Sequence, residues 1–232
     1  MLLKPWNELP EFMQTDAVRP YYDALQKHKA SIALKRIFDF TVSAILLLII
    51  WPFLIIIAIA VKLDSPGPAF YNQERVTTYG RRFKIHKFRT MVANADQIGS
   101  QVTISHDQRI TRIGKILRGI RLDELPQVIN ILTGEMSFVG TRPEVPEYVE
   151  AYKPEYYATL LLPAGVTSEA SIRYKDEYKL LANAEDVDNA YIQQVLPAKM
   201  VWNLNSLHRF SFQKDMLTIV RTVFAILGKE YH

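Results

Sequence analysis

Two adjacent carboxylates, Asp123 and Glu124, are the strongest candidates for reactive groups in this chain. Pro126 and an apolar run at residues 128–132 follow them. Proline suits a first helical turn, because its missing N–H group would have no intrahelical partner there. The pair is therefore predicted at a helix N-terminus, where partial positive charge and free N–H groups favour carboxylates and bound phosphate. Spacing alone favours an ordinary solvated helix cap over a metal–phosphate site.

Cationic residues occur on both sides of the carboxylate pair. They are Lys115, Arg118 and Arg121 before it and Arg142 after it. A guanidinium can donate two parallel hydrogen bonds to a phosphate, which makes Arg142 a candidate phosphate ligand. The pattern therefore keeps both interpretations of the pair open.

The composition restricts the classes of site and partner. The chain has 232 residues, 49% hydrophobic and 22% charged, which is typical of a globular protein. Its formal net charge of +4 suits an anionic partner, whether nucleic acid, anionic lipid or a phosphorylated substrate. Cysteine is absent, which excludes thiolate metal sites, and the histidines do not form a close pair with the spacing of zinc ligands.

An uncharged apolar run extends from Thr41 to Val61, and its length of roughly 20 residues matches a bilayer core. A buried helix of a soluble protein is the alternative, but the run is too long and too uniformly apolar to favour it. Pro52 lies in the middle of the run and removes a backbone hydrogen bond, so a kink is predicted there.

Basic residues flank this apolar run on both sides. They are Lys27, Lys29, Lys35 and Arg36 before it and Lys62, Arg75, Arg81, Arg82 and Lys84 after it. Because basic flanks remain on the cytoplasmic side, both ends are predicted there. A helix broken at Pro52 that enters and leaves the same face satisfies this rule, and a spanning helix does not.

The segments after the membrane run indicate a hairpin and a basic helix. Residues 69–76 and 82–88 alternate weakly around a turn, which predicts a β-hairpin. Lys87 and Arg89 would share one side of an extended strand and could grip a diphosphate, although a solvated basic strand is the simpler interpretation. Residues 109–121 form a basic amphipathic pattern, typical of a membrane interface but also of nucleic-acid binding or core coverage.

The stretch from residue 113 to residue 143 resembles the core signature of the bacterial sugar transferases, the monotopic polyprenyl-phosphate phosphoglycosyl transferases. The positions that carry the resemblance are Ile113-Gly114, Leu117-Arg118, Leu122-Asp123-Glu124-Leu125-Pro126-Gln127, Asn130, Leu132, Gly134, Met136-Ser137, Val139-Gly140 and Arg142-Pro143. Further matching positions are Gly67-Pro68, Phe70, Gln73, Arg75, Gly80, Phe83 and Lys87-Phe88-Arg89-Thr90-Met91. The match is long, ordered and rich in unusual positions.

The resemblance implies an enzyme that moves a sugar 1-phosphate from a UDP-sugar to polyprenyl (undecaprenyl) phosphate and releases UMP. It implies that Asp123 is the nucleophile of a covalent intermediate and that Mg²⁺ is held through Glu124 and Asp123. The implied substrate- and phosphate-binding residues are Lys87, Arg89, Arg118 and Arg142. The implied location is the cytoplasmic face of a bacterial inner membrane, at the first membrane step of a glycoconjugate pathway, with no nucleic-acid partner.

The chain departs from the family pattern at several positions. Trp51 replaces Ser before Pro52, Thr141 replaces Pro, Pro163-Ala164 replaces Arg-Pro, Ser168 replaces Gly, and Asn203 replaces Asp. Most of these departures bear on nucleotide-sugar contacts more than on the reaction itself. The alternative function is a membrane-anchored basic module that binds anionic lipid or nucleic acid, which explains the charge and the anchor but not the carboxylate pair.

The predicted fold class is α+β and mostly helical. It comprises an N-terminal re-entrant membrane helix hairpin, amphipathic interfacial helices and a small β-hairpin or sheet. The predicted divisions are an N-terminal arm at residues 1–34, a re-entrant membrane helix at 35–63, and a cytoplasmic catalytic domain at 64–232.

Overall fold

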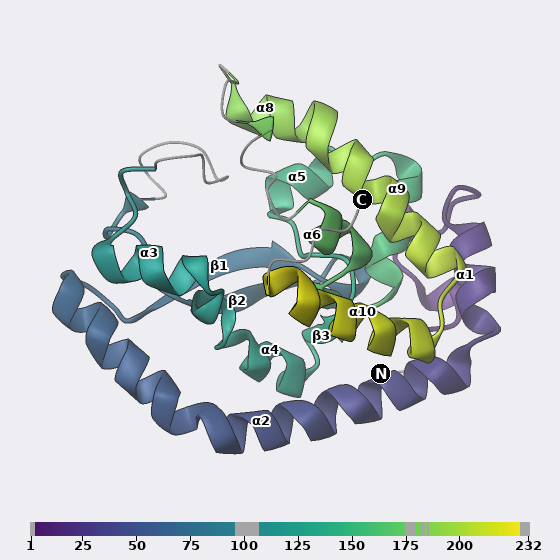
Figure 1. Cartoon of the computed structure of the whole chain (residues 1–232). Coiled ribbons are helices and arrows are strands. Elements are labelled where there is room, and N and C mark those ends of the chain that lie inside the picture. The colour runs from purple at the N-terminus through teal and green to yellow at the C-terminus, as the bar shows by residue number, and fades with distance from the viewer. Residues whose placement is uncertain (1–2, 96–106, 175–179, 182–183, 185, 228–232) are drawn as a thin grey trace.

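The computed structural model describes residues 3–95, 107–174, 180–181, 184 and 186–227. The helices are α1 (Arg19–Gln26), α2 (Lys29–Asp64), α3 (Arg112–Gly119), α4 (Gln127–Thr133), α5 (Pro146–Glu150), α6 (Glu169–Arg173), α8 (Val187–Ala190), α9 (Leu196–His208) and α10 (Phe212–Ile226). The strands are β1 (Phe70–Val76), β2 (Arg82–Phe88), β3 (Met136–Val139) and β4 (Ala164–Thr167). The prediction of a mostly helical α+β chain with a small sheet is confirmed (Figure 1).

Two small sheets hold the strands. Strands β1 and β2 form the predicted antiparallel hairpin, with Phe70 opposite Phe88 and Val76 opposite Arg82. Strands β3 and β4 pair in parallel, which the sequence did not indicate. Here Gly140 and Gly165 are in such close approach that a Cβ added to Gly165 would lie 2.1 Å from the Gly140 nitrogen. Only glycine at residue 165 permits this backbone contact.

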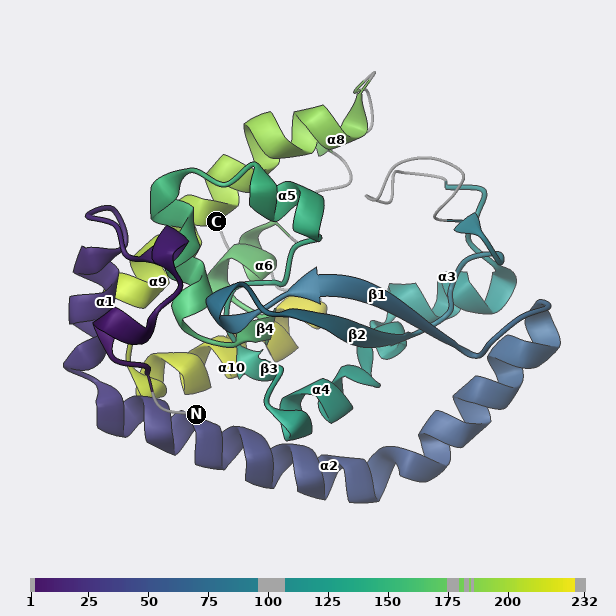
Figure 2. The ribbon, with the colours of Figure 1, turned by 180° about the vertical axis from the view of Figure 1, so that it is seen from behind.

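Helix α2 runs without interruption from Lys29 to Asp64, through Pro52. It curves along one side of the molecule, with both ends turned toward the rest of the chain (Figures 1 and 2). The helix is thus not interrupted at Pro52, where a break was predicted. The loss of one N–H group can bend a helix without ending it. The re-entrant path stays a prediction, and the predicted boundary at residue 35 falls inside α2.

Charged side chains attach the first part of α2 to the backbone around β3. The Lys35 ammonium donates to the Val139 carbonyl and to Asp215, both at 2.7 Å. The neighbouring Arg36 donates to two carbonyls at the end of α4, and Asp39 accepts from the Phe138 N–H at 3.2 Å. These buried contacts fix the start of the apolar helix on the globular body.

The other end of α2 is attached by Arg89, which follows β2. The buried Arg89 guanidinium donates to the carbonyls of Ser65, Pro66 and Val61, the last turn of α2 and the residues after it. A cation at a helix C-terminus also opposes the negative end of the helix dipole. Asp64 in turn accepts from the Ile113 N–H at 3.1 Å. Both ends of α2 therefore attach to one globular body.

Residues 3–28 contribute to the main hydrophobic core instead of extending from it as an arm. Their buried apolar side chains are those of Leu3, Leu9, Met13, Val18, Tyr22 and Leu25. They pack against residues 160–162 and against Leu207 and Phe210, which lie at the end of α9 and just after it. Val18, Tyr22 and Leu25 follow the helical spacing of α1, but the polar and proline residues around them hide the core contribution of the whole segment in the sequence.

Several helices expose apolar side chains. The residues are Ile37, Leu48, Ile56 and Leu63 on α2, Ile116 on α3, Ile120 just after it, and Leu217, Val220, Val223 and Phe224 on α10. Helix α3 buries Gly114 and Leu117 on its other face, so the predicted amphipathic helix is confirmed over a shorter range. Its location at a membrane interface stays a prediction. Helix α2 is long and apolar enough to cross a membrane.

We expect Arg89→Met to lower the free energy of unfolding by about 3 kcal/mol, because three carbonyl groups in the last turn of α2 and just after it lose a charged hydrogen-bond donor. Thermal unfolding in detergent measures this loss. The matched control is Arg82→Met, since the Arg82–Glu74 ion pair lies on the surface and contributes less than about 1 kcal/mol. Equal melting temperatures for the two variants would show that Arg89 does not hold the helix end.

Candidate active site

Asp123 and Glu124 lie in a single 3₁₀ turn, Leu122–Glu124, which leads into α4. Pro126 is the N-cap residue of α4, so the predicted position of the pair at a helix start is confirmed. Arg121, just before the turn, has a left-handed backbone with φ of 60°. This conformation reverses the chain sharply after α3 and points the two carboxylates into the protein.

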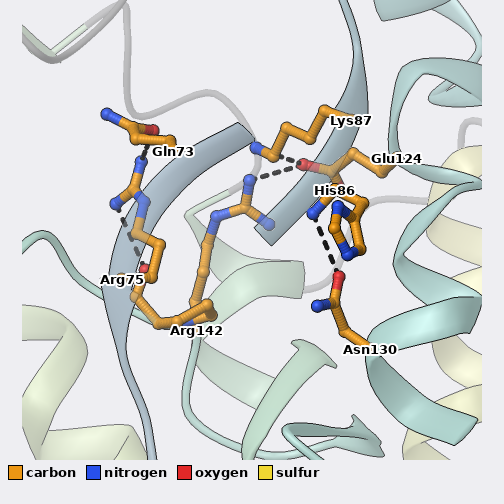
Figure 3. A network of polar contacts seen from close by, with 8 residues as sticks. Gln73, Arg75, His86, Lys87, Glu124, Asn130 and Arg142 are labelled. Carbon is orange, nitrogen blue, oxygen red and sulfur yellow. Dashed lines mark hydrogen bonds and ion pairs between the residues drawn. The ribbon is translucent and has the colours of Figure 1, made fainter. Parts of the chain in front are cut away.

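Glu124 joins three segments that are distant in the sequence. Its Oε1 accepts from Arg142 Nη2 at 2.5 Å and from Lys87 Nζ at 3.3 Å (Figure 3). The Glu124 side chain is 11% exposed, and those of Lys87 and Arg142 are 18% and 27% exposed. Two of the predicted phosphate-binding residues, Lys87 and Arg142, thus contact one carboxylate of the pair directly, and phosphate binding by them stays a prediction.

The two cations determine the protonation of Glu124. Burial alone raises the pKa of this carboxyl group, but the charges of Arg142 and Lys87 outweigh that effect. The pKa of Glu124 is therefore held well below its usual range. Burial lowers the pKa of Lys87 to about 8, with the Glu124 charge opposing and the Arg142 and Arg75 charges adding to the shift.

Asp123 has a different environment from its neighbour. It is 9% exposed, and within the described residues its Oδ1 atom has no hydrogen-bond partner. Burial raises the pKa of Asp123, and the Glu124 charge raises it further, against the opposing charges of Lys87, Arg118 and Arg121. The helix start and the cations were expected to favour the ionised form, so the net direction of the shift is opposite to that expectation.

Of the two remaining predicted phosphate-binding residues, Arg118 lies near the carboxylate pair and Arg89 lies at the end of α2. Arg118 lies close enough for its charge to act on Asp123, and burial lowers the pKa of its guanidinium. Arg89 does not share a surface with Lys87, because the strand ends at Phe88 and its guanidinium turns to the end of α2. The structure thus gives Arg89 a structural contact where a phosphate-binding role was predicted.

Sequence reasoning gave no role to Arg75 or Glu144, which lie behind Arg142. Arg75 donates to the Pro143 carbonyl at 3.2 Å and to Gln73, on the same face of β1 (Figure 3). Glu144 accepts from Tyr191 at 2.7 Å, and Lys199 donates to the same phenol oxygen at 2.9 Å. These buried groups support the segment that carries Arg142. Gln73 and Arg75 were among the positions that match the family pattern, and their two-residue spacing could have suggested part of this arrangement.

The carboxylates fit a magnesium ion only in part. The Asp123 Oδ1, which has no hydrogen-bond partner among the residues that the structure describes, is the kind of hard oxygen ligand that Mg²⁺ prefers, and Glu124 is its neighbour. Within the described residues, no cluster of three or more His, Asp or Glu side chains could hold a metal ion alone. Mg²⁺ commonly binds through one or two carboxylates together with substrate phosphates and water, and these two residues match that arrangement.

Four departures from the expected family pattern line one cavity of about 290 Å³. They are Thr141, Pro163, Ser168 and Asn203. The cavity lies between the start of α2, the β3–β4 sheet, α9 and α10, and its lining includes neither Asp123 nor Glu124. These four departures are therefore clustered in one cavity, whose lining excludes both carboxylates.

Comparison with known proteins matches residues 30–229 to the family model described as bacterial sugar transferase. A UDP-N-acetylgalactosamine-undecaprenyl-phosphate N-acetylgalactosaminephosphotransferase of Aeromonas hydrophila is 33% identical over 84% of this chain and 44% of its own length. A UDP-glucose:undecaprenyl-phosphate glucose-1-phosphate transferase of Caulobacter vibrioides is 34% identical over 83% of this chain and 69% of its own length. An Escherichia coli protein with that same name is 40% identical over 69% of this chain and 36% of its own length. The chain thus spans less than half the length of two of these relatives.

We expect Arg142→Gln to lower the free energy of unfolding by about 3 kcal/mol, because the buried Glu124 carboxylate loses a charged partner. Adding Glu124→Gln should recover more than half of this loss, since the uncompensated charge is then removed. Chemical denaturation in detergent measures both. Arg221→Gln is the control, because its ion pair with Glu169 is 40% and 24% exposed and contributes less than about 1 kcal/mol. A double variant no more stable than Arg142→Gln would contradict this account.

Proposed function

Because this chain belongs to the bacterial sugar transferase family, we propose that it transfers a sugar 1-phosphate from a UDP-sugar to undecaprenyl phosphate and releases UMP. The names of these three relatives describe this class of reaction. The observation that carries the proposal is Asp123, a buried carboxylate beside an ion-paired glutamate and several cations, with one oxygen that has no hydrogen-bond partner in the described part of the chain. A module that only bound anionic lipid would have no use for this buried pair of carboxylates.

In the proposed mechanism, Asp123 attacks the phosphorus atom that carries the sugar. A bond forms between the Asp123 carboxylate oxygen and this phosphorus, while the bond from phosphorus to the oxygen of the departing UMP breaks. In the second step, an oxygen of the lipid phosphate attacks the same phosphorus and releases the Asp123 carboxylate. A covalent intermediate divides one two-substrate reaction into two simpler displacements.

The cations around the pair suit the charge of this substrate. Lys87 and Arg142 already converge on Glu124, and each could turn a donor toward a diphosphate oxygen bound beside it. Arg118 adds positive charge on the side of Asp123. A magnesium ion held by Glu124 and Asp123 would supply further neutralisation of the diphosphate charge. These groups together would stabilise charge that moves from the attacking carboxylate to the leaving phosphate.

The attachment of α2 supports a monotopic arrangement, and its basic flanks support the cytoplasmic face of a bacterial inner membrane. A spanning helix would hold its two flanks on opposite sides of the bilayer. The Lys35–Val139 contact and the Arg89–Ser65 contact instead tie both flanks to the same globular body. The exposed apolar side chains of α2 would then enter only one leaflet. This path brings the carboxylate site to a lipid acceptor that cannot leave the membrane.

We expect enzyme given a UDP-sugar without lipid acceptor to release up to one equivalent of UMP and to gain the mass of a phospho-sugar. The adduct should map to the peptide that contains Asp123. Asp123→Asn should fold and release none, because an amide cannot form the acyl phosphate. Chelation of divalent ions should abolish release, and added Mg²⁺ should restore it. A screen of several UDP-sugars identifies the donor.

The matched control is Asp107→Asn, which alters another buried carboxylate that pairs only with Arg109 among the ion pairs of the described residues. This variant should keep most of the transferase activity of its folded fraction. Substantial transfer by Asp123→Asn, or an adduct on another residue, would show that Asp123 is not the nucleophile. A complete absence of UMP release with every UDP-sugar would refute the proposed function itself.

For the membrane path, we expect cysteines placed at Lys29 and Glu74 to resist an impermeant thiol reagent added to intact spheroplasts. Both positions are exposed, and the chain has no native cysteine to react. Both cysteines should react after lysis, which is the control for accessibility. Labelling of one cysteine alone in intact spheroplasts would mean that α2 spans the bilayer.

A further inference from the structure

Asn130 is a fully buried polar residue of α4, with all of its amide atoms engaged in hydrogen bonds. Its Oδ1 accepts from the His86 N–H at 3.0 Å (Figure 3). Its Nδ2 donates to the Lys84 carbonyl at 2.9 Å and to Glu135 at 2.8 Å. Two of these three bonds therefore reach the backbone of β2, a separate element that lies more than 40 residues earlier.

The Asn130 amide occupies the edge of β2 that no strand covers among the described residues. Strand β2 pairs only with β1 there, and backbone groups alternate in direction along a strand. Lys84 and His86 are two residues apart, so their backbone groups face the same side. Asn130 binds one carbonyl and one N–H group on that side, as a neighbouring strand would. It thereby joins α4 to a defined register of β2.

Apolar packing between α4 and β2 defines the register of β2 less strictly than the Asn130 hydrogen bonds do. Ile131 of α4 packs with Phe83, Ile85 and Met136 in a small buried cluster. Hydrophobic contact is non-directional and tolerates small displacements of one element along another. Hydrogen bonds from a buried amide to named backbone atoms do not tolerate them, because a displaced amide would remain unsatisfied.

The register matters because Lys87 directly follows His86 in β2. Glu124 lies six residues before Asn130, and its Oε1 is 3.3 Å from the Lys87 ammonium. Displacement of a strand by one residue turns each side chain to the opposite face. We propose that Asn130 is a positioning residue, which sets the contact between Lys87 and Glu124 and so acts on catalysis through Lys87. The inference rests on the proposed transferase function.

A double-mutant cycle tests the coupling, with kcat/KM measured from UMP release by the full chain in detergent. Asn130→Ser has too short a side chain to keep its bonds to β2, and Lys87→Met removes the cation. We expect Asn130→Ser alone to lower kcat/KM about 10- to 100-fold. Adding it to Lys87→Met should lower kcat/KM little further, because the contact that Asn130 sets is already lost.

The control is Thr133→Val. It removes a hydroxyl group of α4 that also donates to Glu135 but makes no hydrogen bond to β2 among the described residues. It should change kcat/KM little, and its effect should multiply with that of Lys87→Met. If Asn130→Ser does not fold, Asn130→Asp enters the same cycle, since it keeps the acceptor for the His86 N–H and loses both donors. Full multiplication of the Asn130 and Lys87 effects would overturn the positioning role alone. Absence of UMP release from the wild-type chain would overturn the transferase function and this inference together.

Discussion

The charge of the buried Glu124 carboxylate is the constraint around which the site is built. An uncompensated charge in this environment would cost several kcal/mol, so cations must reach it. Arg142 comes from the segment after β3 and Lys87 from β2, and both contact the same oxygen atom. The hairpin, the turn before α4 and the loop after β3 must therefore meet at one point. The buried Glu144, Tyr191 and Lys199 then support that loop from behind.

Buried polar groups at the two ends of the long apolar helix also need partners. Lys35, Arg36 and Asp39 are too polar for lipid, and each finds a partner on α4, β3 or α10. Arg89 neutralises the far end of the helix by binding its last carbonyl groups. The apolar middle can then remain exposed, because its flanks are fixed by directional contacts. The apolar helix and the carboxylate site are consequently attached to the same globular body.

The adjacent carboxylates illustrate how position separates two chemically similar groups. Glu124 faces two cations in contact distance, and its pKa is lowered. Asp123 is buried beside that negative charge, and its pKa is raised. Neighbouring acids with opposite shifts are typical of sites in which each group has a different role. A charge-compensated glutamate suits a holding role, and an aspartate whose Oδ1 has no hydrogen-bond partner among the described residues suits an attacking role.

The sequence by itself determined the features that depend on near neighbours. The β1–β2 hairpin follows from alternation around a short turn, α3 from three-to-four spacing, and the position of Asp123 from Pro126 three residues later. The family signature also identified Lys87 and Arg142 as site residues. Only the tertiary structure decided the parallel β3–β4 pairing, the helix-capping contact of Arg89 and the core position of residues 3–28. These depend on contacts such as Lys35 with Val139, 104 residues apart, and Lys87 with Glu124, 37 residues apart. Local periodicity carries no information about such partners, because they are chosen by packing and by the need to compensate buried charge.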